Sequence, residues 1–251
     1  MRKLVDTVMR LLLFVVVFLL MQIVSIYIVK HLPLGGDASL QQLVTYSCSM
    51  LLTLIALNLC QRWVVPSERN IMKKISGLNP IVTLMGVIIL IALSIVVNPL
   101  EQYMPADRRI FDDSVWTLIT VVFLAPIFEE IIFRNQLYNI LRSNCSSLVA
   151  VLLSSLVFSA IHLEPVVLIS GVVSGIVFSY AYLRTRSICA PIILHMCNNA
   201  LAYALTILSY NERSLLELVD SDAYSLIIYI ISSVIVLAAM TIMTIRISRF
   251  K

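Results

Sequence analysis

The chain contains few charged residues and almost no long polar segment. Only 13% of its 251 residues are Asp, Glu, Lys or Arg, whereas soluble globular domains carry about 25%. Hydrophobic residues make up 60% of the chain, and the mean hydropathy is +0.99. Apolar segments of about 20 residues recur from end to end. This composition excludes a soluble globular protein and predicts an all-α polytopic membrane protein with one membrane domain, residues 1–251.

Cysteine is scarce and is not arranged in pairs. The five cysteines form no C-x-x-C motif, and most of them fall within apolar segments. They are Cys48, Cys60, Cys145, Cys189 and Cys197. This pattern predicts free buried thiols and excludes a disulfide framework.

Eight apolar segments predict about eight transmembrane helices packed in one bundle. The predicted spans cover residues 11–29, 40–61, 80–98, 114–141, 147–162, 166–183, 188–209 and 223–245. The first span is expected to be retained, because it exceeds the roughly 7–15 apolar residues of a signal peptide and no A-x-A-like site follows before Lys30. Ser170-Gly171 and Ser174-Gly175 form a small-xxx-small pattern on the sixth span, which predicts close helix packing.

The basic residues are unevenly distributed between the two predicted sides of the membrane. With the N-terminus inside, all but four of the 18 Lys and Arg residues fall on the cytoplasmic side. The four exceptions are Lys30, Arg108, Arg109 and Arg213. This bias predicts that both termini are cytoplasmic and that the number of spans is even. It also explains the net charge of +4, so no nucleic-acid partner is predicted.

Two adjacent carboxylates interrupt the fourth span, in the segment A-P-I-F-E-E-I-I-F-R that ends at Arg134. An ionised acid near the centre of a membrane helix costs ~2.5–3.5 kcal/mol, so Glu129 and Glu130 should be paired, functional or both. Glu130 lies four residues before Arg134, which permits an ion pair of structural or catalytic purpose. Glu129 points about 100° away from that face. Pro126 removes a helical N–H and should leave the carbonyl of Val122 disturbed, which predicts a kink.

Two further polar pairs lie on other spans. Phe158 and His162 end the fifth span, and His195 and Asn199 lie four residues apart on one side of the seventh. Each also has an ordinary structural interpretation: His162 as an interfacial histidine, and Asn199 as a hydrogen-bonding residue between helices. Together with an intramembrane carboxylate, however, the set predicts a site in a polar cavity within the membrane.

The predicted depths of these residues agree only in part. Counted from the nearest inner arginines, His195 lies ~13 Å and Glu129 ~20 Å into the membrane at 1.5 Å per residue. A fifth span that starts near residue 147 places His162 toward the outer face instead. The sequence leaves open whether this helix starts deep, tilts, or has other boundaries.

These side chains are suited to hydrolysis. A carboxylate beside an imidazole can take a proton from water, and a second imidazole with an asparagine amide can donate hydrogen bonds to an oxyanion. The alternative is a catalytic zinc site with Glu129, His162 and His195 as ligands. The H-E-x-x-H motif is absent, so those ligands would come from three separate helices. No cofactor is favoured, and zinc stays the alternative.

The motifs Glu-Glu-x-x-x-Arg, Phe-x-x-x-His and His-x-x-x-Asn, in this order on apolar spans, resemble the CPBP family over residues 114–210. This family comprises CAAX prenyl endopeptidases of the Rce1 type and bacterial bacteriocin-processing or self-immunity proteins, often labelled Abi. The resemblance implies an eight-helix intramembrane endopeptidase with a catalytic core at 114–210. It implies that Glu129 and His162 activate water without a metal, and that His195 with Asn199 binds the oxyanion. Supporting roles are implied for Glu130, Arg134 and Phe158.

The favoured function is therefore an intramembrane endopeptidase acting on a membrane-associated peptide or lipidated protein precursor, of CAAX, pheromone or bacteriocin-leader type. The first alternative is a non-enzymatic bacteriocin self-immunity or scaffolding protein. A proton- or cation-coupled transporter is disfavoured, because the sequence shows no paired half-repeats. The expected partners are the lipid bilayer and the substrate, and the resemblance favours a bacterial plasma membrane.

Overall fold

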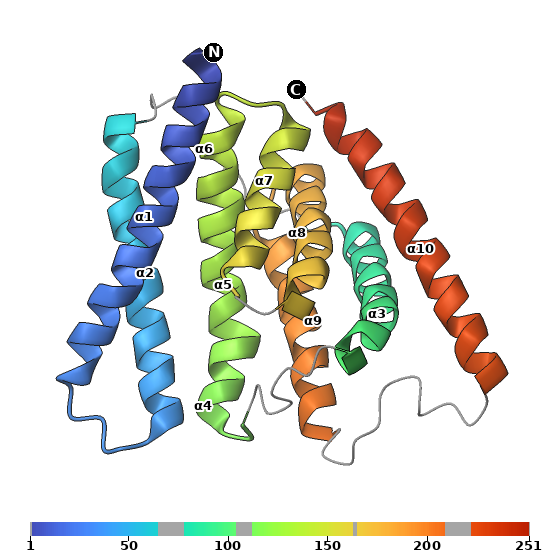
Figure 1. The fold of residues 1–251 in the computed structure, drawn as a ribbon, viewed down its shortest axis with the longest axis horizontal. Coiled ribbons are helices and arrows are strands. Elements are labelled where there is room, and N and C mark those ends of the chain that lie inside the picture. The colour runs from blue at the N-terminus through green and yellow to red at the C-terminus, as the bar shows by residue number, and fades with distance from the viewer. Residues whose placement is uncertain (1, 65–77, 104–111, 163–164, 209–221, 251) are drawn as a thin grey trace.

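The computed structural model describes residues 2–64, 78–103, 112–162, 165–208 and 222–250. In this part of the chain all regular secondary structure is helical (Figure 1). The helices are α1 (Arg2–Lys30), α2 (Ala38–Val64), α3 (Pro80–Tyr103), α4 (Val115–Leu118), η1 (Ile119–Leu124), α5 (Ala125–Glu130), η2 (Ile131–Leu137), α6 (Tyr138–Arg142), α7 (Ser147–Ala160), α8 (Pro165–Thr185), α9 (Cys189–Leu208) and α10 (Asp222–Ser248). The predicted outer-loop residues Arg108, Arg109 and Arg213, and the terminal residues Met1 and Lys251, lie outside the described residues.

The predicted all-helical membrane fold is confirmed. Within the described residues, seven helical segments are long and apolar enough to cross a membrane, and the run from α4 to α6 forms one of them. The remaining predicted span corresponds to α7, which has only 14 residues. At 1.5 Å per residue α7 is about 21 Å long, which is less than the ~30 Å of a bilayer core. It therefore ends partway through the bundle.

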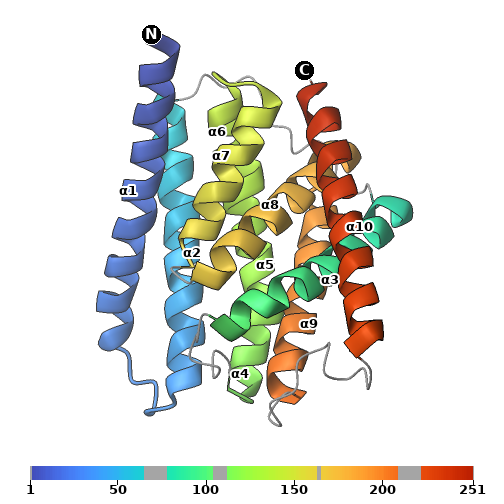
Figure 2. The same ribbon diagram turned by 45° about the vertical axis from the view of Figure 1, so that its right-hand side comes forward.

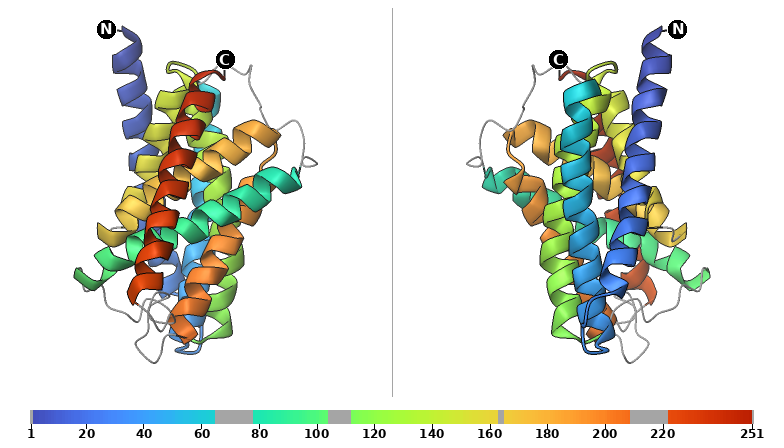
Figure 3. Two further views of the ribbon diagram at one scale, coloured as in Figure 1. Left: turned by 90° about the vertical axis from the view of Figure 1, so that its right-hand side faces the viewer. Right: turned by 90° about the vertical axis from the view of Figure 1, so that its left-hand side faces the viewer.

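The helices form one bundle with a pair of packed helices at each edge. α1 packs against α2 at one edge, and α3 packs against α10 at the other (Figure 1). The run α4–α6, α7, α8 and α9 lie between them, and α3 crosses the bundle obliquely (Figure 2). The start of α1 and the end of α10 lie at the same end of the bundle in every view (Figure 3).

Apolar side chains cover the outer faces as well as the interior. Large hydrophobic residues on α1 and α10 are exposed, as they are on a surface that lipid covers. Examples are Leu4, Met9, Val16, Ile23, Leu226, Val234 and Leu237. Inside, the ring of Phe133 meets those of Phe14 at 5.9 Å and Phe18 at 6.1 Å. These aromatic contacts hold α1 against the helix that carries the glutamates.

α7 and α8 approach each other at two glycines of α8. A Cβ atom on Gly171 would lie 2.6 Å from Ser159 Oγ, and one on Gly175 would lie 2.9 Å from Ser155 Cβ. Neither position has space for a side chain, so the close packing predicted from the small-residue pattern is confirmed.

A hydrogen-bonded cluster joins three helices at the end of the bundle opposite the termini. The carboxylate of Asp112 accepts hydrogen bonds from Ser39 Oγ (2.8 Å) and from the N–H of Ser114 (3.2 Å). The hydroxyl of Tyr203 on α9 donates to the backbone carbonyl of Asp112 at 3.1 Å. The pKa of Asp112 is lowered mainly by a hydrogen bond with the side chain of Thr117, and to a smaller extent by the one with Ser39. This cluster fixes the starts of α2 and α4 beside the end of α9.

Candidate active site

The two glutamates lie on α5, a short α-helical segment between two π-helical segments, η1 and η2. In a π-helix each N–H bonds to the carbonyl five residues earlier, which rotates the following side chains relative to an α-helix. Such segments are frequent at functional sites. The irregular helix therefore sets the directions in which Glu129 and Glu130 project.

Pro126 leaves one backbone carbonyl without a helical donor. At the end of η1 each N–H bonds to the carbonyl five residues earlier. In this register an N–H at position 126 would donate to the carbonyl of Val121, but Pro126 has none. The Nδ2 group of Asn199 on α9 donates to the Val121 carbonyl instead, at 2.9 Å. The sequence-based choice of Val122 was wrong by one residue, because it assumed an α-helical register. Asn199 thus makes the interhelical hydrogen bond that its sequence context allowed.

Both glutamates face the imidazole of His195. Nδ1 of His195 lies 2.9 Å from Glu130 Oε1, and Nε2 lies 3.8 Å from Glu129 Oε2. The first distance is a hydrogen bond, whereas the second exceeds the ~2.7–3.2 Å of a direct one. Glu130, Glu129 and His195 are 0%, 6% and 3% exposed. Because an ionised Glu130 only accepts hydrogen bonds, it holds Nδ1 as the donor nitrogen and turns Nε2 toward Glu129.

Arg134 balances the charge of Glu130. Its Nε lies 3.1 Å from Glu130 Oε2, so the ion pair predicted from the i, i+4 spacing is present, and both side chains are buried. Nη2 of Arg134 also donates to the carbonyl of Gly175 on α8 at 3.3 Å. Gly175 is needed here, because a Cβ atom would lie 3.2 Å from this Nη2. The guanidinium therefore links η2 to α8 behind the glutamates.

Tyr46 on α2 contacts the other glutamate. Its hydroxyl donates to Glu129 Oε1 at 2.8 Å, and its ring lies 6.5 Å from that of Phe128. Glu129 thus has one oxygen held by a hydroxyl and the other directed at His195. Each carboxylate oxygen has a distinct neighbour, which restricts the rotation of the side chain.

Two phenylalanine rings enclose the arginine and the histidine. The ring of Phe178 on α8 stacks on His195 with a centroid distance of 4.7 Å. The ring of Phe158 lies 5.6 Å from His195, edge to face, and 4.3 Å from the guanidinium carbon of Arg134. Buried cation–π contacts of this kind contribute on the order of 2 kcal/mol. The rings also exclude water from the Glu130–Arg134 pair.

His162 lies next to this cluster but makes different contacts. Its Nδ1 lies 3.0 Å from the Phe158 carbonyl, and its ring is 5.3 Å from the Phe158 ring. Among the described residues, no hydrogen bond or ion pair joins His162 to Glu129. α7 begins beside the end of the chain and ends halfway along the bundle (Figure 1). This short helix explains why His162 lies near the site, although a full span would have placed it at the far face.

Comparison with known proteins finds a family similarity over part of the chain. Residues 111–201 match the model of the type II CAAX prenyl endopeptidase Rce1-like family. The chain is 25% identical over 221 residues to the membrane-embedded CAAX protease MroQ of Staphylococcus aureus, covering 79% of this chain and 89% of that protein. Over residues 111–201 the chain is therefore similar to the Rce1-like family. No solved structure matches it significantly.

Two other relatives are matched over shorter segments. The putative membrane peptidase YdiL of Bacillus subtilis is 33% identical over 82 residues, which are 33% of this chain and 34% of YdiL. An uncharacterized 24.3 kDa protein of Escherichia coli is 33% identical over 110 residues, which are 42% of this chain and 50% of that protein. The chain therefore spans half or less of these two relatives.

The structure adds two residues to the candidate site that sequence reasoning missed. Phe178 lies within the family match but carries no polar group to distinguish it from other apolar positions of its span. Tyr46 lies outside the match, on α2, in a span whose first turns also contain Gln41 and Gln42. That polar start of the span is a signal that could have pointed to it.

The side chains do not fit the zinc alternative. In the described part of the chain, no group of three or more His, Cys, Asp or Glu side chains is arranged to hold a metal ion. Of the proposed ligands, Glu129 and His195 face each other, while His162 Nδ1 is turned to the Phe158 carbonyl.

Proposed function

We propose that this protein is an intramembrane endopeptidase that hydrolyses a peptide bond in a membrane-associated peptide or protein precursor. The main support is that two adjacent, buried carboxylates face the same imidazole, that of His195. Glu130 holds Nδ1 of this ring, and Nε2 faces Glu129. The Rce1-like match over residues 111–201, which contains all three residues, supports it. We assign the catalytic core to residues 114–210.

In the proposed mechanism Glu129 is the general base. The 3.8 Å between Glu129 Oε2 and His195 Nε2 is a separation that a bridging water can occupy. Glu129, assisted by His162 beyond the Phe158 ring, takes a proton from that water. The resulting hydroxide attacks the peptide carbonyl carbon. The proton then passes to the leaving amine as the C–N bond breaks, so one water is consumed for each bond cleaved.

His195 and Asn199 stabilise the negative charge that develops on the carbonyl oxygen. In its imidazolium form His195 has a proton on each ring nitrogen, so Nδ1 stays bonded to Glu130 while Nε2 donates to that oxygen. Asn199 has a second N–H on the Nδ2 that already donates to Val121. Hydrogen-bond donors fixed before the reaction are effective, because no reorganisation is needed in the transition state. Glu130, Arg134 and Phe158 hold His195 in place and do not touch the substrate.

The function test compares the peptides released by cells that carry the wild-type protein or Glu129→Gln at equal membrane abundance. A precursor that accumulates only with Glu129→Gln supports the protease and names the substrate among CAAX-type, pheromone and bacteriocin-leader precursors. If Glu129→Gln preserves a cellular phenotype such as bacteriocin protection, the non-enzymatic immunity or scaffolding function replaces the protease.

Replacing Tyr46 by Phe is expected to lower kcat about tenfold or more. The change removes the hydroxyl that donates to Glu129 Oε1 and keeps the ring beside Phe128. A hydrogen bond to a charged group contributes about 1.5–3 kcal/mol. The measurement is the cleavage rate of the purified protein against pH. Tyr27→Phe, which alters an exposed tyrosine of α1, is the control. An unchanged rate and pH profile for Tyr46→Phe contradicts a role for this hydroxyl.

We propose a bacterial plasma-membrane location with both termini cytoplasmic. The start of α1 and the end of α10 share one end of the bundle (Figure 3), and Arg184, Arg246 and Arg249 lie at that end. A reporter active only in the cytoplasm, fused after Lys251, should be active, and the same reporter inserted after Gly36 should be silent. The reverse result overturns the orientation.

A further inference from the structure

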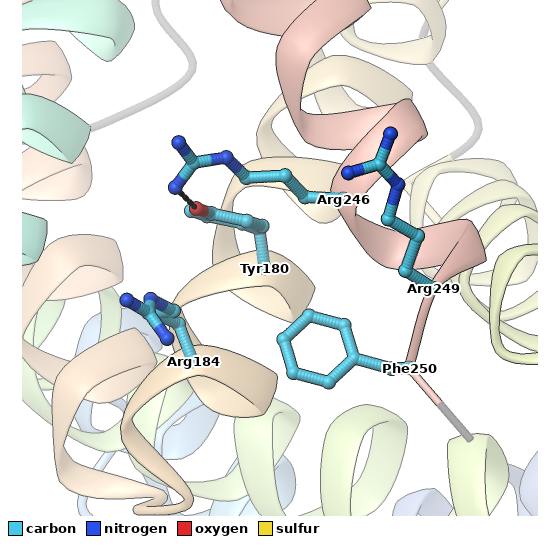
Figure 4. A pocket seen from close by; sticks show the side chains of 5 residues that line it. All are labelled: Tyr180, Arg184, Arg246, Arg249 and Phe250. Atoms are coloured by element: carbon cyan, nitrogen blue, oxygen red, sulfur yellow. Dashed lines mark hydrogen bonds between the residues drawn. The ribbon is translucent and has the colours of Figure 1, made fainter.

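A pocket of about 240 Å³ lies between the ends of α8 and α10, away from the glutamates. It is lined by Tyr180, Arg184, Arg246, Arg249 and Phe250 (Figure 4). Three arginines thus surround one small space. Within the described part of the chain, no Asp or Glu forms an ion pair with any of them. Like charges held this close repel each other, and an anion in the pocket would remove that repulsion.

The walls of the pocket are fixed by contacts on both sides. Nη1 of Arg246 donates to the Tyr180 hydroxyl at 3.4 Å (Figure 4). On the other side, Ser147 Oγ donates to the carbonyl of Phe250 at 2.6 Å, and Arg142 Nε donates to that same Ser147 Oγ at 2.9 Å. The end of the chain is therefore anchored on the start of α7, which holds the Phe250 ring against the pocket.

The pocket lies where the apolar surface of the bundle ends. Two candidate membrane spans, Leu168–Thr185 and Ala223–Ser248, finish at its arginines. Ile242 and Ile245, about one turn before Arg246 and Arg249, are 51% and 48% exposed. A group bound at the arginines would thus continue onto an apolar face, with aromatic rings at the boundary, as at a lipid interface.

We propose that this pocket binds a phosphate group, carried by an anionic lipid headgroup or free in solution. Arginine is suited to phosphate because its planar guanidinium donates two parallel hydrogen bonds. Basic pockets between membrane helices bind anionic headgroups in this way. The proposal does not depend on peptidase activity, because the pocket shares no residue with the proposed catalytic site.

The test uses native mass spectrometry of the purified full-length protein in neutral detergent. The probes are phosphatidylglycerol, phosphatidylcholine and inorganic phosphate. Wild-type protein should retain phosphatidylglycerol in preference to phosphatidylcholine, with affinity falling as salt rises. Arg→Gln at positions 184, 246 and 249 should weaken binding about fivefold for each arginine removed. Arg249 lies beyond the end of α10. The single variant Arg249→Gln should therefore leave the helix bundle folded.

The matched control is Arg186→Gln, an exposed arginine near the end of α8 that does not line the pocket. It should bind like the wild type, and lipid-free thermal unfolding should confirm that each variant is folded. Binding of phosphatidylglycerol but not inorganic phosphate identifies a headgroup site, and binding of inorganic phosphate by itself identifies a free-phosphate site. Equal binding of the probes by the folded triple variant and the control overturns the proposal, as does equal binding of the two lipids without any binding of inorganic phosphate.

Discussion

Glu129→Gln should reduce the rate of peptide cleavage by about a thousandfold, because a general base contributes on the order of 10²–10⁴ to a rate. The amide oxygen of Gln can still accept the hydrogen bond from Tyr46, but the side chain can no longer take a proton from water. Stability should change little, since size and hydrogen bonding are kept. The measurement is single-turnover cleavage by purified protein, together with thermal unfolding of both proteins.

Asp113→Asn is the matched control for this loss. It also exchanges a carboxylate for an amide within the Rce1-like segment, but at an exposed position before α4. Its cleavage rate should equal that of the wild type. A folded Glu129→Gln protein that cleaves at the wild-type rate would falsify the assignment of Glu129 as the base.

Arg134→Met should lower the free energy of unfolding by about 3–5 kcal/mol, the usual cost of leaving one partner of a buried ion pair uncompensated. Glu130 is fully buried, so its charge has no access to water once the guanidinium is gone. Methionine keeps much of the apolar contact with the Phe158 ring. The measurement is unfolding in mixed detergent, with the exposed-site variant Arg186→Met as control.

A second substitution separates the structural and catalytic interpretations of this ion pair. Glu130→Gln combined with Arg134→Met removes both charges and should recover most of the lost stability. Cleavage should stay about tenfold below wild type, because a neutral amide holds His195 Nδ1 less firmly than a carboxylate does. Recovery of stability and rate together would show that the pair is structural alone.

The helices could largely be predicted from the sequence. The third predicted span and α3 both begin at residue 80, and the fifth and α7 both begin at residue 147. The largest difference is at α1, which begins at Arg2 and not near residue 11. Helical hydrogen bonds do not require apolar side chains, so hydropathy marks the part of a helix that lies in lipid and not where the helix starts.

Only part of the candidate site followed from the sequence. The contact of Glu130 with Arg134 was predictable, because residues four apart share a helix face. The contacts of Glu130 with His195 and of Glu129 with Tyr46 join residues 65 and 83 positions apart. Such pairs depend on how far each helix is rotated and shifted against its neighbour, which no local periodicity specifies.

The amino-acid sequence by itself determined the membrane class, the helices and most residues of the candidate site, because hydrophobicity and i, i+4 spacing are properties of one segment at a time. Only the tertiary structure decided which imidazole meets the two carboxylates. Three features settle this: the π-helical register around Pro126, the early end of α7, and the close approach of α8 at Gly175. These features set how the helices are placed against one another, and a hydrogen bond tolerates only a few tenths of an ångström.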